Sequence, residues 1–223
     1  MLTEWLFSLW CEITLRRTPQ REYSVKLVIA TKNKNKMREI AEKFSSLRTI
    51  QLVSLLNYDD APEIIENGIT FKENACKKAI AISDYTKLPA LADDSGLEID
   101  ALNGEPGIYS ARYAGENKTD EERNQLILKK MEGVPEQKRT ARFRCAIALV
   151  LNDTVYTNEG VCEGRITYSM RGDDGFGYDP IFFIPQLNKT MAELPLSQKN
   201  KISHRAIALD KTRELLEKLC DGS

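Results

Sequence analysis

The sequence of 223 residues lacks several features that would assign its chemistry at once. Its only histidine is His204, so neither a histidine-based zinc site nor a Ser/His/Asp arrangement is apparent. The five cysteines are widely spaced and form no C-x-x-C pair, which favours buried, reduced thiols in a cytoplasmic protein. Lysine and arginine number 32 against 33 acidic residues, so no net positive charge indicates nucleic-acid binding.

The first 24 residues lack the uninterrupted apolar run of a secretory signal, because Glu4 and Glu12 break it. The interrupted apolar stretch within them is also too short to cross a membrane, which takes about 20 apolar residues. Their apolar residues recur at helical spacing, so an amphipathic helix for a partner or a membrane surface is one interpretation. A mis-assigned start or an expression leader is the interpretation that we favour. We therefore expect residues 1–24 to lie outside the fold and residues 25–223 to form one domain.

The most informative stretch is Leu91-Ala92-Asp93-Asp94-Ser95-Gly96, in which two carboxylates follow an apolar run. This pattern predicts a strand that ends in a turn at Ser95-Gly96. Ligands of α/β proteins bind outside such strand ends. Neighbouring residues of a strand point to opposite faces, so the two aspartates are expected to have different roles. We assign Asp94, which is nearer the turn, to catalysis and Asp93 to a supporting role.

The remaining apolar patterns predict a mixed α/β fold. Strands are expected over 25–30, 50–55, 97–102, 140–151, 155–166 and 181–184, and Asn152-Asp153 predicts a hairpin turn. Capping boxes at Thr70/Glu73 and Thr119/Glu122 predict two helix starts, and the last helix is expected near Ser203.

The run Thr31 to Lys36 lies between a predicted strand and a predicted helix, where backbone N–H groups favour an anion. A lysine in the first helical turn opposes the helix dipole, and a bound phosphate would explain Lys36. The alternative is a solvated loop with Asn33 or Asn35 as the N-cap.

Two further runs could contact a ligand. The glycines and aromatic residues of Gly175 to Asp179 allow close backbone approach and offer a flat face, although they also occur in ordinary tight turns. His204 and Arg205 could donate hydrogen bonds to a polar ligand edge, although a lone histidine is more often structural.

Six runs together resemble the Ham1-like inosine triphosphate pyrophosphatases. They are T-x-N-x-x-K at 31–36, T-F-x-E-N-A at 70–75, A-D-D-S-G-L at 92–97, P-G-I-Y-S-A-R at 106–112, G-F-G-Y-D-P at 175–180 and S-H-R at 203–205. The resemblance covers about residues 25–220 and implies an elongated mixed-sheet α/β fold with two lobes around a nucleotide cleft. It also implies a homodimer and Mg²⁺-dependent hydrolysis of ITP, dITP or XTP to the monophosphate and pyrophosphate, with no nucleic-acid or membrane partner.

The resemblance also implies a role for each matching residue. Asp94 would be catalytic and, with Glu66, would bind Mg²⁺. The substrate would be contacted at its phosphates by Thr31, Asn33, Lys36, Lys78 and Lys199, with Ser95 beside it. Phe176 would stack on the base within the run that contains Gly177 and Tyr178, and Asp179, His204 and Arg205 would surround the base edge.

Two other functions remain open from the sequence. The first is a related pyrophosphatase that acts on pyrimidine or modified nucleotides. The second is a regulator that binds nucleotides without catalysis, although intact Asp94, Glu66 and lysines argue against it. The acidic pair Asp173-Asp174 departs from the usual pattern of the family, and we expect both side chains to face solvent.

Overall fold

The structure, a computed structural model, describes residues 25–221, so the prediction for residues 1–24 lies outside it. The described chain contains a seven-stranded sheet in the order β2-β1-β3-β4-β5-β6-β7. Its strands are β1 (Val25–Ile29), β2 (Ile50–Ser54), β3 (Ala90–Ile99), β4 (Thr140–Leu151), β5 (Thr154–Ile166), β6 (Phe182–Ile184) and β7 (Lys189–Thr190). β1 is parallel to β2 and to β3, and every other neighbouring pair is antiparallel. The predicted mixed sheet is confirmed.

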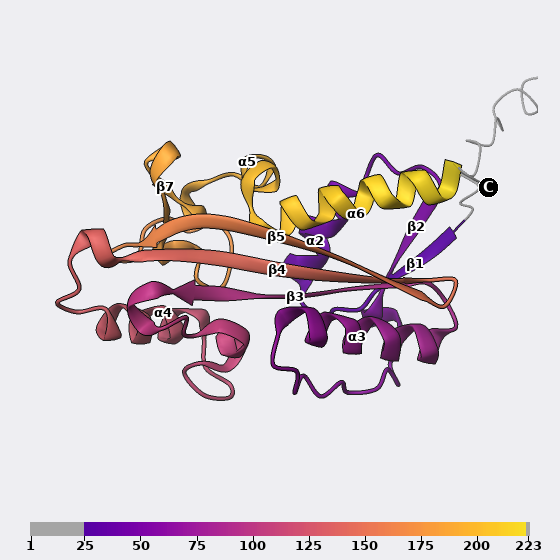
Figure 1. The fold of residues 1–223 in the computed structure, drawn as a ribbon, viewed down its shortest axis with the longest axis horizontal. Helices are drawn as coiled ribbons and strands as arrows, with labels where there is room; N and C mark the ends of the chain where they lie inside the picture. Colours follow the sequence, from indigo (N-terminus) through magenta and orange to yellow (C-terminus); the bar gives the residue numbers. More distant parts are fainter. Residues whose placement is uncertain (1–24, 222–223) are drawn as a thin grey trace, which may run out of the picture.

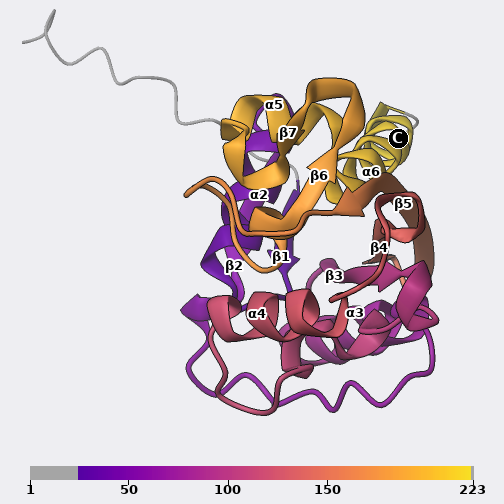
Figure 2. The same ribbon diagram turned by 90° about the vertical axis from the view of Figure 1, so that its left-hand side faces the viewer.

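Helices cover both faces of this sheet. They are α2 (Lys34–Lys43), α3 (Phe71–Thr86), α4 (Asp120–Lys130), α5 (Leu196–Ile202) and α6 (His204–Asp221). The long strands β3, β4 and β5 follow the long axis of the molecule, with α6 on one side and α3 and α4 on the other (Figure 1). The view along this axis places α2 and α5 on the side of α6 (Figure 2). None of the helices within residues 25–221 is long and apolar enough to cross a membrane.

The helix starts follow from local capping. Asn33 Oδ1 accepts hydrogen bonds from the backbone N–H groups of Asn35 and Lys36 and caps α2. Thr70 caps α3, and Thr119 forms a complete capping box with Glu122 at α4. These starts agree with the sequence prediction, whereas the short helix α5 was not predicted.

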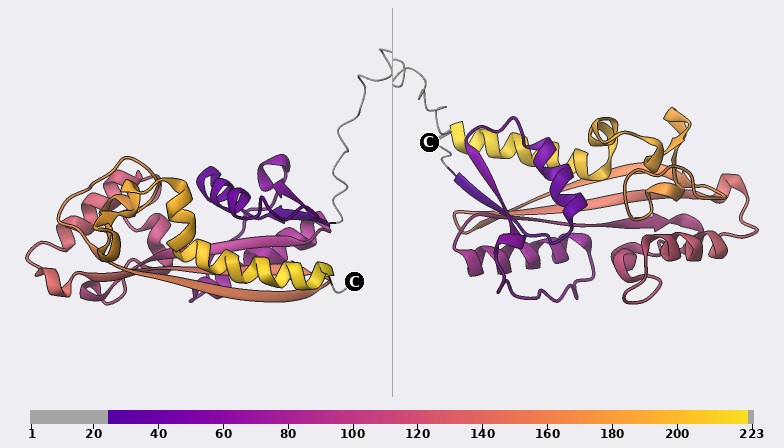
Figure 3. Two further views of the ribbon diagram at one scale, coloured as in Figure 1. Left: turned by 90° about the horizontal axis from the view of Figure 1, so that it is seen from above. Right: turned by 180° about the vertical axis from the view of Figure 1, so that it is seen from behind.

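The apolar core has three parts that divide the elongated molecule into two lobes. The first lobe contains two apolar clusters. One lies on the face of the sheet that α2 and α6 cover and includes Leu27, Ile29 and Ile40, and the other lies beneath α3 on the opposite face of the sheet. The third cluster, which includes Ile127 of α4 and Phe182 of β6, fills the other lobe. Views from above and from behind show these lobes at opposite ends of the long strands (Figure 3).

The predicted turn at Ser95-Gly96 is wrong. β3 runs without a break from Ala90 to Ile99, and β4 pairs with every residue of that range. Serine, glycine and aspartate have low strand propensity, but pairing with a long neighbour overrides that preference. The predicted strand over 97–102 is therefore the last part of β3, and a short 3-10 turn, Asp100–Leu102, follows it.

Candidate active site

A cleft opens beside β3 at the point where β1 ends. β1 pairs with β3 at only two positions, Val28 with Ala90 and Ile29 with Leu91. The two aspartates follow directly, so they lie beyond the end of the parallel strand. The aspartates were expected at the end of their own strand, and that expectation is wrong; the strand that ends beside them is β1.

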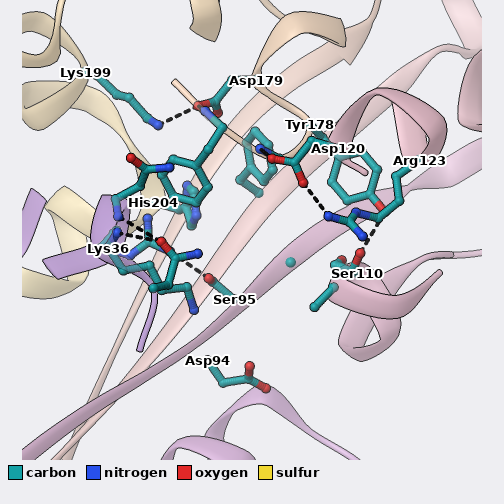
Figure 4. Close-up of a pocket in the computed structure, with 18 of the residues that line it drawn as sticks. Lys36, Asp94, Ser95, Ser110, Asp120, Arg123, Tyr178, Asp179, Lys199 and His204 are labelled. Carbon is teal, nitrogen blue, oxygen red and sulfur yellow. Dashed lines mark hydrogen bonds and ion pairs between the residues drawn. The ribbon is translucent and has the colours of Figure 1, made fainter. Parts of the chain in front are cut away.

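The cleft brings together nearly all of the predicted site residues. It is lined by Asn33, Lys36, Glu66, Lys78, Asp94, Ser95, Phe176, Gly177, Tyr178, Asp179, Lys199, His204 and Arg205. Figure 4 shows several of these side chains converging from different elements. Thr31 is not among the lining residues, and its Oγ1 accepts a hydrogen bond from the backbone N–H of Asn33 at 3.2 Å. A phosphate contact by Thr31 stays a prediction.

Asp93 and Asp94 point to opposite faces of the sheet, as alternation along a strand requires. Asp93 is 2% exposed and lies on the side of α2 and α6, where it pairs with Lys36 at 2.9 Å and Arg205 at 3.0 Å. Burial opposes its ionisation, but these two cations hold the pKa of Asp93 well below its usual value. Asp93 is therefore an ionised structural support, and the predicted supporting role agrees with this geometry.

Asp94 lies on the side of α3. Its Oδ2 accepts a hydrogen bond from Asn74 Nδ2 at 3.1 Å, and its Oδ1 is 3.4 Å from Lys78 Nζ. Burial raises the pKa of Asp94 despite the nearby Lys78 and Lys36 ammonium groups. Glu66 Oε1 is also 3.4 Å from Lys78 Nζ, so the two predicted metal ligands converge on one cation. Burial opposes the charge of Lys78, but Asp94 and its acidic neighbours raise the pKa of Lys78 overall.

A buried carboxylate that the sequence analysis did not assign connects two of the predicted cations. Glu39 of α2 is 3% exposed, with Oε1 2.8 Å from Lys199 Nζ and Oε2 2.5 Å from Arg205 Nη1. Lys199 also donates to Asp179 Oδ2 at 2.6 Å. Together with the Asp93–Arg205 pair, these contacts form a continuous series of ion pairs in which positive and negative side chains alternate. The series runs from the predicted phosphate side of the cleft to its predicted base side.

Phe176 forms one wall of the predicted base site. Its backbone N–H donates to Asp179 Oδ2 at 2.9 Å, and its ring centroid lies 4.5 Å from Lys199 Nζ and 5.6 Å from the Arg205 guanidinium carbon. The guanidinium of Arg205 also donates to Ser95 Oγ at 2.8 Å. Most of its donors are therefore already used, and the predicted contact of Arg205 with a base stays a prediction.

His204 is buried. Its ring stacks on Phe143 with centroids 4.7 Å apart, and its Nδ1 has no hydrogen-bond partner within residues 25–221. Burial, together with the positive charges of Arg205 and Lys199, lowers the pKa of His204 well below its usual value. A neutral imidazole with a free ring nitrogen can still form a hydrogen bond with a polar ligand.

The sequence analysis also missed residues of α4 that hold the base-side loop. Asp120 Oδ2 accepts a hydrogen bond from the Gly177 N–H, and Asn124 Nδ2 donates to the Gly177 carbonyl, each at 2.7 Å. Asp120 and Arg123 line the cleft. The capping box at Thr119 located this helix start, but nothing in the sequence indicated which loop the helix would contact.

Asp173 and Asp174 are exposed, as expected.

Comparisons with known proteins identify the family of the chain. The sequence profile of the Ham1 family matches residues 27–215. A dITP/XTP pyrophosphatase of Desulforamulus reducens is 50% identical over 196 residues, which cover 87% of this chain and 97% of that protein. One from Geobacter sulfurreducens is 54% identical over 185 residues, or 82% and 92% of the two chains.

Solved structures show the same fold. A HAM1 protein from Coxiella burnetii superposes with a TM-score of 0.80 at 44% identity, and the match covers 87% of this chain and 99% of that one. The Ham1 protein of Staphylococcus aureus gives a TM-score of 0.77 at 40% identity, with 86% and 98% covered. The chain belongs to the Ham1 family.

Proposed function

We propose that the protein hydrolyses the noncanonical purine nucleoside triphosphates ITP, dITP and XTP to the nucleoside monophosphate and pyrophosphate. The observation that carries this proposal is the convergence of Lys36, Lys78 and Lys199, from three separate helices, on one cleft that also contains Asp94. The relatives of this chain that are named dITP/XTP pyrophosphatase support dITP and XTP as substrates and pyrophosphate as a product.

The cleft is suited to a triphosphate because phosphoryl chemistry depends mainly on positioning and on charge stabilisation. Each of the three lysines is paired with a carboxylate in this structure. Entry of a triphosphate would offer these ammonium groups new anionic partners. The lysines would then stabilise the negative charge that develops on the leaving pyrophosphate.

The acidic groups fit Mg²⁺, which takes oxygen ligands and often uses one or two carboxylates together with substrate phosphates. Glu66 and Asp94 already hold a cation, the Lys78 ammonium, between them. Residues 25–221 contain no cluster of three or more His, Cys, Asp or Glu side chains suited to a metal. Phosphate oxygens and water would therefore complete the shell, and the ion would neutralise phosphate charge.

Asp94 is the group that we assign to the attacking water. Water would add to the α-phosphorus, the bond to the bridging oxygen would break, and pyrophosphate would leave. Asp94 would accept the proton that the water loses. Its raised pKa makes it a stronger base than an exposed aspartate. Asn74 donates to Oδ2, whereas Oδ1 is 3.4 Å from Lys78 Nζ.

Base selection would depend on donors that meet the 6-keto oxygen of hypoxanthine or xanthine. Adenine carries a 6-amino donor at that position, so a donor of His204 or Arg205 aimed there would meet another donor instead of an acceptor. Guanine shares the 6-keto group, so its 2-amino group must be the feature that is rejected. A hundredfold preference needs only about 2.7 kcal/mol, which one or two poorly met polar groups can supply.

The test is incubation with ITP, XTP, dITP, GTP and ATP, with and without Mg²⁺, with separate measurement of pyrophosphate and orthophosphate. We expect Mg²⁺-dependent release of pyrophosphate from the first three substrates. Orthophosphate as the first product would contradict the reaction, and faster hydrolysis of pyrimidine or modified nucleotides would contradict the substrate class. Binding without turnover would indicate a regulator instead.

We further propose that the protein is a homodimer in the cytoplasm. Light scattering would test the oligomeric state, and cell fractionation would test the location.

A further inference from the structure

Asn74 contacts both Asp94 and the loop that carries Glu66, although it does not line the cleft. Its side chain is fully buried and makes two hydrogen bonds in opposite directions. Nδ2 donates to Asp94 Oδ2 at 3.1 Å, and Oδ1 accepts from the backbone N–H of Gly68 at 2.7 Å. One planar amide thereby connects the carboxylate on β3 to the backbone of the loop before α3.

The loop end of this bridge depends on a glycine. A Cβ atom at Gly68 would lie 2.6 Å from Asn74 Oδ1 and 2.8 Å from Glu73 Cβ, so a side chain at this position would displace the loop. The next residue, Ile69, donates its N–H to Glu73 Oε2 at 2.9 Å, which fixes the loop to the first turn of α3 a second time. Glu66 is only two residues before Gly68, so this anchor limits where its carboxylate can lie.

The helix supplies two contacts to Asp94 one turn apart. Asn74 and Lys78 are at positions i and i+4 of α3 and therefore lie on the same face. Asn74 binds Asp94 Oδ2, whereas Lys78 approaches Oδ1 and also Glu66. Each oxygen of Asp94 thus has a different partner, which fixes the rotation of the carboxylate.

We propose that Asn74 is a positioning residue for the hydrolysis, one that holds Asp94 through its amide nitrogen and the Glu66 loop through its amide oxygen. This inference rests on the proposed function. The site needs one donor and one acceptor in a single neutral group, because an aspartate would place a second negative charge against Asp94. An alanine would release both the carboxylate and the loop.

The two halves of the bridge can be separated by two variants. Asn74→Asp keeps an acceptor for the Gly68 N–H and loses the donor to Asp94, whereas Asn74→Ala loses both. We expect kcat for ITP to fall about 10- to 100-fold in both variants, with KM changed less than about threefold. Hydrogen exchange of the Gly68 amide should stay slow in Asn74→Asp and become at least about tenfold faster in Asn74→Ala.

The matched control is Asn67→Asp, the same substitution in the same loop. Asn67 is exposed and accepts a hydrogen bond only from Lys77, at 2.7 Å, among the contacts found within the described chain. This variant should retain wild-type kcat and slow Gly68 exchange. A purely structural asparagine would lower the melting temperature and leave kcat of the folded protein unchanged, and that result would overturn the inference.

Other outcomes are equally decisive. Wild-type kcat in folded Asn74→Asp, or slow Gly68 exchange in Asn74→Ala, would refute the corresponding half of the bridge. If Asn74→Asp does not fold, Gly68→Ala tests the same bridge from the loop side, where unchanged kcat would contradict it. Failure of the wild-type protein to release pyrophosphate from ITP would refute the proposed function instead, and the exchange measurement would still decide whether the bridge exists.

Discussion

Adjacent residues of one strand occupy two different electrostatic environments. Asp93 faces Lys36 and Arg205, and its pKa is held low, whereas burial raises the pKa of Asp94 on the other face. The first aspartate balances buried charge, and the second retains the capacity to take up a proton. The difference arises from the partners that each face of the sheet provides, because the two side chains are chemically the same.

Replacement of Asp94, the carboxylate that we propose as the base, tests folding and turnover separately. We expect Asp94→Asn to fold normally, because an amide can still accept a hydrogen bond from Asn74, and to lower kcat by about 100-fold or more through loss of the base. Steady-state kinetics with ITP and circular dichroism measure the two effects. A rate near that of the wild type would rule out the assignment of Asp94.

Glu39 offers a test of the buried charge chain. In Glu39→Gln, the amide nitrogen would face either Lys199 or Arg205, both of which are donors. We expect the protein to lose about 3 kcal/mol of unfolding free energy or more. We also expect the ITP-over-ATP ratio of kcat/KM to fall about tenfold, because Lys199 and Arg205, which lie beside Phe176, lose the carboxylate that pairs with them.

Glu42→Gln is the matched control, because Glu42 lies on the same helix and is exposed. It should leave both the stability and the selectivity unchanged. Equal effects of the two substitutions in urea unfolding and in substrate competition would show that the position of Glu39 has no special importance.

At the scale of elements, the long hairpin of β4 and β5 carries α6 against the site. Gly160 of β5 permits this close approach, since a Cβ atom there would lie 2.1 Å from the carbonyl oxygen of His204 and 2.7 Å from the Ala208 nitrogen. α6 begins at His204, so the distance between β5 and α6 sets the positions of His204 and Arg205.

Gly160→Ala should therefore move the start of α6. We expect a loss of about 1–3 kcal/mol in unfolding free energy from overpacking. We also expect a raised KM for ITP, because His204 and Arg205 shift together. The neighbouring exposed substitution Glu159→Ala serves as the control. Wild-type stability and KM in Gly160→Ala would contradict the packing argument.

The sequence predicted the class of fold and most of the residues that meet in the cleft. It failed at Ser95-Gly96, whose low strand propensity suggested a turn, because the ten-residue pairing with β4 cannot be read from local composition. It also failed at Glu39 and Asn74, whose partners are distant in the sequence. Glu39 is one turn after Lys36, but only the arrangement of α2, α5 and α6 shows that a buried carboxylate is needed there.

At the scale of the whole molecule, two lobes joined by continuous strands surround the cleft. Residues 25–221 contain all of the cleft described above, and the family match begins at residue 27. That residues 1–24 lie outside the functional domain stays a prediction.

A truncated protein that begins at Val25 tests this division. We expect its melting temperature to stay within about 2 °C of the full chain. Its kcat/KM for ITP should also be unchanged within about twofold. Differential scanning calorimetry and pyrophosphate release are the measurements. Loss of folding or of activity would assign residues 1–24 to the functional protein.

The alternation of Asp93 and Asp94 along β3 has a consequence for how the gene can vary. Substitutions within β3 change one side chain at a time, but a single-codon insertion or deletion before Asp93 could shift the strand by one residue and exchange its two faces. Asp94 would then face Arg205, and Asp93 would face Lys78. We therefore expect variation in residues 90–99 to occur by replacement at constant length, while the exposed loops absorb changes in length.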